Sequence, residues 1–327
     1  MPPKSHKQWL ASQLESICEL GSRVSEVEPE VSHAYRMHTA LKLAALNHCL
    51  EVFLPIARSQ IQNGTFDSAV FIDLFAGCGA TRVPETGDWL AGSPILAAGS
   101  TRAFDRILCI EKNETHCDAL RERLSRFPAR NSVVLHGDCN NLAASVRGKI
   151  PYGNPLVFVF VDPEGMDLRW STLKALSHEF RYMDLLLNFP YGAERVLADL
   201  RRGREMNERV MGAFAGLDWP MLLLERNKGV VDFVESKISS VLGRPVGDRV
   251  LVKDTANHPR YFLLIRVRRT SGGSPFYRGY EAMLNRVAGL KPAEVEGVLN
   301  DKFGRSIHSF EGKAGEERAQ DSPEHEP

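Results

Sequence analysis

The sequence has little of what marks a secreted, metal-binding or membrane-spanning protein. It contains only six cysteines, and no two form a Cys-x-x-Cys pair or lie beside histidines at ligand spacing. We therefore expect no zinc site, and instead reduced, buried thiols in a cytoplasmic protein. The longest apolar run, Leu156 to Val161, is too short to cross a bilayer, so no membrane association is expected. Residues 1–10 show no signal-peptide core.

An excess of one charge is also missing. The chain has 41 Lys and Arg against 41 Asp and Glu, so nothing in the total charge indicates nucleic acid. Residues 311–327 hold six acids and two bases, which leaves 39 bases and 35 acids, a net charge of +4, in the remainder. A basic face is therefore allowed but not required.

Alternating strand and helix patterns predict the fold class. Helical segments separate the apolar strands expected at 69–74, 106–111, 132–136, 156–162 and 183–188. This alternation predicts an α/β fold with a doubly wound, Rossmann-like parallel sheet. Two later strands, 249–254 and 261–269, are separated by so short a turn that they can pair only antiparallel. A final reversed strand is typical of class I methyltransferases and not of dinucleotide dehydrogenases.

The same patterns divide the chain into four parts. We expect an N-terminal helical extension at 1–62 and the Rossmann-like domain at 63–272. A C-terminal helical segment should follow at 273–310. The acidic tail, 311–327, should be disordered because it has few apolar residues to bury. Residues 83–103 are rich in Gly, Pro and Ser, which predicts a loop with one short helix.

The strongest local motif follows the first strand. Asp73 ends an apolar run, and Phe75, Gly77 and Gly79 lie in the turn that comes after it. Glycines let the backbone pass close to a ligand without a Cβ clash. The motif predicts a site for S-adenosylmethionine in which Asp73 accepts a hydrogen bond from the methionyl ammonium. The alternative is an ordinary glycine turn after a buried strand.

Two more acids follow the next two strands. Glu111 can accept both ribose hydroxyls, the role that a carboxylate plays in NAD sites. Asp138 is placed to accept from the adenine amino group. The ordered series Asp73, Glu111, Asp138 is more specific than any one member. An NAD site is the rival, but Arg82 stands where a full G-x-G-x-x-G would have its last glycine.

The fourth strand ends in a candidate reaction site. Methyltransferases that modify base amines carry Asp/Asn-Pro-Pro-aromatic here, and the acid and a backbone carbonyl accept from the target amine. This chain keeps Asp162 and Pro163 but has Glu164 and Gly165 in the last two positions. Tyr191, after the next strand, could supply the missing aromatic ring, although it could equally be a half-buried helix-capping tyrosine. Cytosine C5 methylation is excluded because the chain has no Pro-Cys dipeptide to supply the nucleophile.

Several of these motifs, in this order, resemble the three-Cys-motif partner protein (TcmP) family. The resemblance covers roughly residues 35–270, although the family usually has an aromatic where Glu164 stands. It implies a methyltransferase-like fold and a gene-neighbour partner protein of the phage three-Cys-motif type. The motifs are His38-Thr-Ala-Leu-Lys-Leu43, Asp73-Leu-Phe-Ala-Gly-Cys-Gly79, Gly92-Ser-Pro-Ile-Leu96, Asp162-Pro-Glu-Gly165 and Arg260-Tyr-Phe-Leu-Leu-Ile265.

We expect a methyltransferase that uses S-adenosylmethionine, with a nucleic-acid base or a similar amine as acceptor. Two alternatives stay open: a non-catalytic partner or scaffold protein that binds S-adenosylmethionine, and an NAD-binding oxidoreductase. A nucleic-acid substrate would need basic residues near the cleft. The candidates are Arg195, Arg201, Arg202, Arg204 and Arg209 after Tyr191, and Arg266, Arg268 and Arg269 at the end of the last strand.

Overall fold

The structure is a computed structural model of the whole chain. It describes residues 5–34, 37–84, 86–128, 131–150, 153–204, 207–254, 257–268 and 275–303. The expected disordered tail, 311–327, and Arg269 lie outside the described residues.

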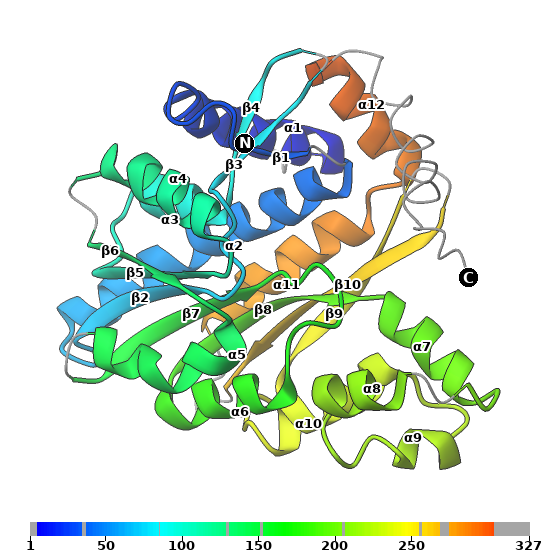
Figure 1. Ribbon diagram of the computed structural model, residues 1–327. Coiled ribbons are helices and arrows are strands. Elements are labelled where there is room, and N and C mark those ends of the chain that lie inside the picture. The colour runs from blue at the N-terminus through cyan, green and yellow to red at the C-terminus, as the bar shows by residue number, and fades with distance from the viewer. Residues whose placement is uncertain are drawn as a thin grey trace, which may run out of the picture.

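A mostly parallel sheet forms the centre of the fold (Figure 1). Its strands are β2 (Ser68–Asp73), β5 (Arg106–Glu111), β6 (Ser132–His136), β7 (Pro155–Val161), β8 (Met183–Pro190), β9 (Val246–Lys253) and β10 (Pro259–Val267). Within the described residues they form one seven-stranded sheet in the order β6-β5-β2-β7-β8-β10-β9. Neighbours from β6 to β8 are parallel, whereas β10 is antiparallel to both β8 and β9. This is a Rossmann-like sheet of the class I methyltransferase type, as predicted.

Helices cover both faces of the sheet (Figure 1). One face packs against α1 (His6–Ser22), α2 (Met37–Gln62), α3 (Ser93–Gly99), α4 (Glu114–Ser125), α11 (Pro275–Ala288) and α12 (Pro292–Phe303). The other packs against α5 (Cys139–Leu142), α6 (Trp170–Glu179), α7 (Gly192–Leu200), α8 (Glu208–Ala215), α9 (Met221–Leu224) and α10 (Val230–Ser240). Because both faces are buried, β7 is apolar along its whole length instead of alternating.

The longest described helix, α2, lies on one face of the sheet and runs from the carboxyl ends of the parallel strands to their amino ends. Phe53 of α2 packs on Phe104 and Phe158 in the core, and Lys42, near the start of the helix, reaches Asp162 beyond the end of β7. Arg58, near its end, hydrogen-bonds Ala103 at the edge where β5 begins. By length and composition α2 could cross a membrane, but 67% of its most apolar window is buried inside the fold.

The predicted loop at 83–103 contains more order than the sequence indicated. It holds β4 (Trp89–Ala91) as well as α3. β4 pairs with β3 (Ala80–Arg82), which in turn pairs with β1 (His33–Ala34). Strands this short give no periodic signal, so sequence patterns could not reveal this small sheet. It carries the N-terminal segment directly over the glycine turn that follows β2.

Candidate active site

The three predicted cofactor acids lie along one edge of the sheet. Asp73, Glu111 and Asp138 follow or end β2, β5 and β6, which are adjacent and parallel. Parallel strands bring their carboxyl ends to one edge, and ligands of open α/β sheets bind there. The structure therefore brings together the residues that the sequence singled out for the cofactor.

Asp73 is the most deeply buried of these acids, with no exposed surface. Its Oδ1 accepts from the Phe75 amide at 3.2 Å, while Oδ2 has no partner in hydrogen-bond geometry among the described residues. Burial raises the pKa of this carboxyl to about 7, against the lowering effects of the Ser93 hydroxyl and the Phe75 amide. Charge repulsion from Asp162 and Glu111 is a smaller contribution to this raised pKa. A cation brought to Oδ2 would favour the ionised form.

Glu111 joins the end of β5 to the glycine turn. Its Oε2 accepts from the Gly77 amide at 2.8 Å, and its Oε1 accepts from the Asn113 amide at 2.8 Å. A carboxylate has about four lone-pair sites, so each oxygen keeps one for a further donor. This is the acceptor capacity that a pair of ribose hydroxyls requires.

Asp138 and Phe75 complete the cofactor edge. Asp138 caps α5, since its Oδ1 accepts from the Asn140 amide at 2.8 Å, and it is half-buried. Phe75 is also half-buried and packs against the core on the α5 and α6 side of the sheet.

The two glycines of the turn have different neighbours. Gly77 and Gly79 have φ values of 59° and 82°, which disfavour any side chain. A Cβ on Gly77 would lie 2.3 Å from His33 Nε2, whereas a Cβ on Gly79 would meet Leu120 at 2.7 Å. Gly79 therefore allows the turn to pack on α3 and α4. The sequence-based interpretation that the glycines of this turn make room for a ligand is wrong for Gly79, because a side chain there would enter the core.

Sequence reasoning missed the segment that covers this turn. His33 lies over it, with Nε2 3.4 Å from the Cys78 amide and its ring 5.0 Å from that of His116. Its interaction with the Cys78 thiol raises the pKa of His33, although burial opposes this, and the charges of Glu164 and Glu111 also raise it. Arg123, fully buried on α4, fixes the segment, because its guanidinium donates to the carbonyls of Val27, Glu28, Val31 and Cys78.

Asp162, the predicted reaction-site acid, follows β7 and is held by a side chain from α2, which covers one face of the sheet. Lys42 Nζ donates to its Oδ1 at 2.5 Å and lies 5.0 Å from the centre of the Tyr261 ring. Burial raises the pKa of Tyr261 well above its ordinary value, and Asp162 adds to that effect. The resemblance had included Lys42 within a motif, but the local sequence gave no sign of its contact with Asp162.

Pro163 and Tyr191 also lie at this edge. Pro163 is buried, and Glu164 beside it is exposed. Tyr191 precedes α7, and its amide donates to the Arg260 carbonyl at 3.1 Å. The Tyr191 ring lies 5.9 Å from that of Phe262, on the sheet face opposite Lys42. Tyr191 is half-buried at the N-cap position of α7.

The candidate basic residues fall into different classes. Arg195, Arg202, Arg204 and Arg209 are exposed around α7 and α8, and Arg202 and Arg204 pair with Asp199. Arg201 instead donates to the carbonyls of Leu222, Glu225 and Lys228, which fixes the chain after α8.

The prediction that the arginines at the end of the last strand lie near the reaction site is wrong. Arg266 is 8% exposed and pairs with Glu235. Because β10 runs antiparallel, Arg266 lies opposite Leu185, at the edge where β8 begins. Arg268 follows at the same edge, its guanidinium 5.4 Å from the Tyr182 ring. Neither arginine can reach the carboxyl edge of the parallel strands.

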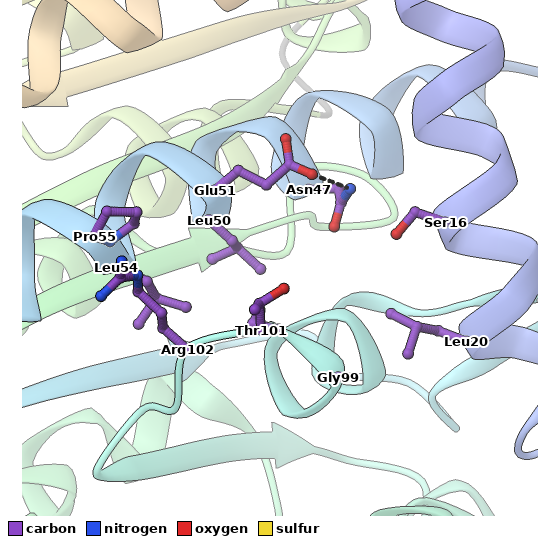
Figure 2. Close-up of a pocket in the computed structure, with 11 residues that line it drawn as sticks. Ser16, Leu20, Asn47, Leu50, Glu51, Leu54, Pro55, Gly99, Thr101 and Arg102 are labelled. Atoms are coloured by element: carbon purple, nitrogen blue, oxygen red, sulfur yellow. Dashed lines mark hydrogen bonds between the residues drawn. The ribbon is translucent and has the colours of Figure 1, made fainter.

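A surface hollow of about 220 Å³ lies away from this edge, between α1, α2 and α3 (Figure 2). Its polar wall is formed by Asn47 and Glu51, which bond to each other and to Gln13 of α1. Arg102 and Thr101 close the side nearest the start of β5. Among the residues that the structure describes, no group of three or more His, Cys, Asp or Glu could hold a metal ion.

Comparison with known proteins shows similarity in structure only. No family model matches the sequence, and no curated protein matches it. A putative O-methyltransferase from Klebsiella pneumoniae is 15% identical, with a TM-score of 0.41 over 82% of this chain and 92% of that one. Trm1 from Pyrococcus horikoshii, in complex with S-adenosyl-L-methionine, is 15% identical, with a TM-score of 0.40 over 76% and 58%. An O-methyltransferase from Bacillus cereus in complex with SAH is 14% identical, with a TM-score of 0.36 over 78% and 100%. At such scores the likeness assigns no ligand, so function has to be argued from this chain's own residues.

Proposed function

We propose that this protein is a cytoplasmic methyltransferase that uses S-adenosylmethionine and transfers the methyl group to an amine, with a nucleic-acid base as the preferred acceptor class. The observation that carries the proposal is the series Asp73, Glu111 and Asp138 at adjacent strand ends, with Asp73 Oδ2 buried and unpartnered within the described part of the chain.

The residues fit this cofactor by the chemistry of their free acceptor atoms. Asp73 offers a buried carboxylate oxygen to the methionyl ammonium, and that cation would offset the cost of ionising an acid whose pKa is about 7. Glu111 offers one remaining site on each oxygen to the ribose hydroxyls. Asp138 keeps Oδ2 for the adenine amino group while Oδ1 caps α5.

When bound, S-adenosylmethionine supplies an electrophilic methyl group on sulfur. Asp162 accepts a hydrogen bond from the acceptor amine, which orients the nitrogen lone pair towards that methyl group. As the N–CH3 bond forms, the S–CH3 bond would break and S-adenosylhomocysteine would be the leaving group. The Asp162 carboxylate would stabilise the positive charge on the methylated nitrogen until that nitrogen loses a proton to water. Catalysis then comes from positioning and electrostatics, without a covalent enzyme intermediate.

The cofactor assignment can be tested by calorimetry. Purified protein is titrated with S-adenosylmethionine, S-adenosylhomocysteine and NAD. We expect both adenosyl ligands to bind and NAD not to. Binding of NAD without either adenosyl ligand would favour the oxidoreductase alternative and reject the proposal.

A second candidate is a non-catalytic partner protein that binds S-adenosylmethionine, in line with the resemblance to three-Cys-motif partner proteins. Glu164 and Gly165 replace the expected proline and aromatic, and Lys42 occupies one oxygen of Asp162. The protein would be incubated with tritiated methyl donor, total nucleic acid and protein, with and without its gene neighbour. Cofactor binding without label transfer in any combination would support this candidate over the enzyme.

A further inference from the structure

Asn188, on β8, is a buried amide without a partner. It is 2% exposed, and neither its Nδ2 nor its Oδ1 has a hydrogen-bonding partner among the described residues. Burying an amide in this way costs free energy, since the group has given up water and gained nothing in return. Apart from functional sites, folded proteins keep few such groups.

The strand register places Asn188 between the two groups that Lys42 touches. In the pairing of β7 with β8, Val161 lies opposite Leu187, so Asp162 and Asn188 come next at the same level. On its other side Asn188 lies opposite Leu263 of β10, two residues from Tyr261. Lys42 runs from Asp162 to the Tyr261 ring and so passes over the end of β8.

Asn188 also faces the side on which Lys42 lies. Side chains alternate along a strand, so Asn188 shares a face with Leu186 and Asp184. Leu186 belongs to the core under α2, and Asp184 accepts a hydrogen bond from Tyr280 of α11 at 2.9 Å. The Asn188 amide therefore lies on the same face of the sheet as Lys42, on the strand between those that carry Asp162 and Tyr261.

Asp162, Asn188 and Lys42, here called the acceptor cluster, offer a specific pattern of hydrogen-bonding groups. Asp162 and Asn188 Oδ1 are two acceptors, and Asn188 Nδ2 is a donor beside them. An exocyclic amine next to a ring nitrogen, as in cytosine or adenine, offers two N–H donors and one acceptor. The ammonium of Lys42, bonded to Asp162 Oδ1 over an aromatic ring, stands in for such an amine.

We infer that the acceptor cluster is the methyl-acceptor subsite and that Asn188 selects nucleobases with an exocyclic amine. Lys42 must leave Asp162 for the base to bind. This rests on the proposed function, because it names the acceptor for the same cofactor site. A uracil or hypoxanthine edge places an oxygen against Asn188 Oδ1 and Asp162, and this repulsion excludes it.

The test uses two matched pairs of nucleotides that differ at this edge: CMP with UMP, and AMP with IMP. Binding to the protein saturated with S-adenosylhomocysteine is measured by calorimetry. We expect wild-type protein to prefer CMP and AMP by tenfold or more, and Asn188→Leu to bind both members of each pair equally weakly. Equal binding of each pair by wild-type protein, or no binding of any nucleotide, would overturn the inference.

A stability measurement separates this role from a structural one and needs no cofactor. Asn188→Leu keeps the side-chain volume and removes the unpartnered amide, so we expect its thermal midpoint to rise. The matched control is Asp184→Leu, which removes a bonded group on the same face and should lower the midpoint. A lower midpoint for Asn188→Leu would show that buried water satisfies the amide, and the inference would fail. Should wild-type protein bind no S-adenosylhomocysteine, the proposed function fails, while the nucleotide pairs, titrated alone, still decide whether Asn188 selects the amine edge.

Discussion

The two halves of the carboxyl edge are stabilised in different ways. At the ends of β2, β5 and β6, each acid already accepts a backbone amide: Phe75 for Asp73, Gly77 and Asn113 for Glu111, and Asn140 for Asp138. At the ends of β7 and β8, Asp162 is held by the side chain of Lys42, and Asn188 has no partner among the described residues.

This difference separates a rigid half from an adjustable one. Backbone amides hold the cofactor acids close to their binding geometry, so little ordering is needed when a ligand arrives. A lysine side chain has four rotatable bonds and can leave its partner at low cost, as a subsite that admits a substrate requires.

The largest expected effect comes from Arg123, which joins the N-terminal segment to the glycine turn. Arg123→Met would leave the carbonyls of Val27, Glu28, Val31 and Cys78 without their buried donor. Charged hydrogen bonds of this kind are worth more than neutral ones, so we expect a loss of about 3 kcal/mol in the free energy of unfolding. Urea denaturation followed by circular dichroism would measure it.

Arg121 is the matched control on the same helix. It is exposed, and its partners among the described residues are Asp118 and, at 3.4 Å, the Val134 carbonyl. Arg121→Met should change the free energy of unfolding by no more than about 0.5 kcal/mol. Equal losses from both substitutions would mean that the buried guanidinium does not hold the covering segment.

Asp73→Asn should have the largest effect on ligand binding. The substitution keeps the shape but removes the charge that faces the methionyl ammonium, so affinity for S-adenosylhomocysteine should fall about 30-fold, or ~2 kcal/mol. Wild-type affinity should rise between about pH 6 and 7.5, because Asp73, with a pKa of about 7, must ionise to bind a cation. A pH-independent affinity in wild-type protein would contradict this.

The same carboxyl has a predictable effect on folding. Its pKa is about 7 in the folded protein, against an ordinary value of 3.8, so between these two pH values the folded state binds a proton that the unfolded state has lost. The free energy of unfolding should therefore fall as pH rises from about 4 to about 7. Asp184, also near 7 through burial, contributes a similar slope. Asp73→Asn should flatten the decline in part, and an unchanged slope would show that Asp73 is not the source.

The two halves also differed in how far the sequence predicted them. Asp73, Gly77, Glu111 and Asp138 were predicted because each lies at a strand end that a short apolar run reveals. Lys42 contacts Asp162, and Asn188 and Tyr261 lie near that contact, only because of strand order and the path of α2, which no local pattern encodes. Arg266 is a different case, because the sequence already predicts a reversed last strand. A strand in that direction ends where β8 begins, so its terminal arginines belong at the opposite end from the reaction site.

Glu111→Gln should produce an intermediate effect within the rigid half. One acceptor oxygen becomes a donor, so either the Gly77 or the Asn113 amide loses its partner and the glycine turn loosens. We expect about tenfold weaker binding of S-adenosylhomocysteine, or ~1.4 kcal/mol, with a smaller loss of stability. Glu114→Gln, exposed in the first turn of α4, is the control and should leave affinity unchanged. If both variants bind equally well, Glu111 does not contact the ligand.

The smallest effect is expected at the rim of the adjustable half, formed by α7, which begins beside the candidate acceptor site. Arg202 and Arg204 are exposed just beyond the C-terminal end of α7 and, within the described residues, pair with Asp199, so replacing both with Gln should not alter the fold. Arg201 has to be left intact, because it holds the carbonyls of Leu222, Glu225 and Lys228 and its loss would mimic a binding defect. If nucleic acid crosses this rim, the double variant should bind RNA or DNA about threefold more weakly at low salt, and its affinity should fall less steeply with salt because fewer counterions are released. Fluorescence anisotropy over a salt series would measure both quantities, with S-adenosylhomocysteine affinity as the internal control. An unchanged salt slope would place the contact elsewhere, with exposed Arg195 and Arg209 as the next candidates.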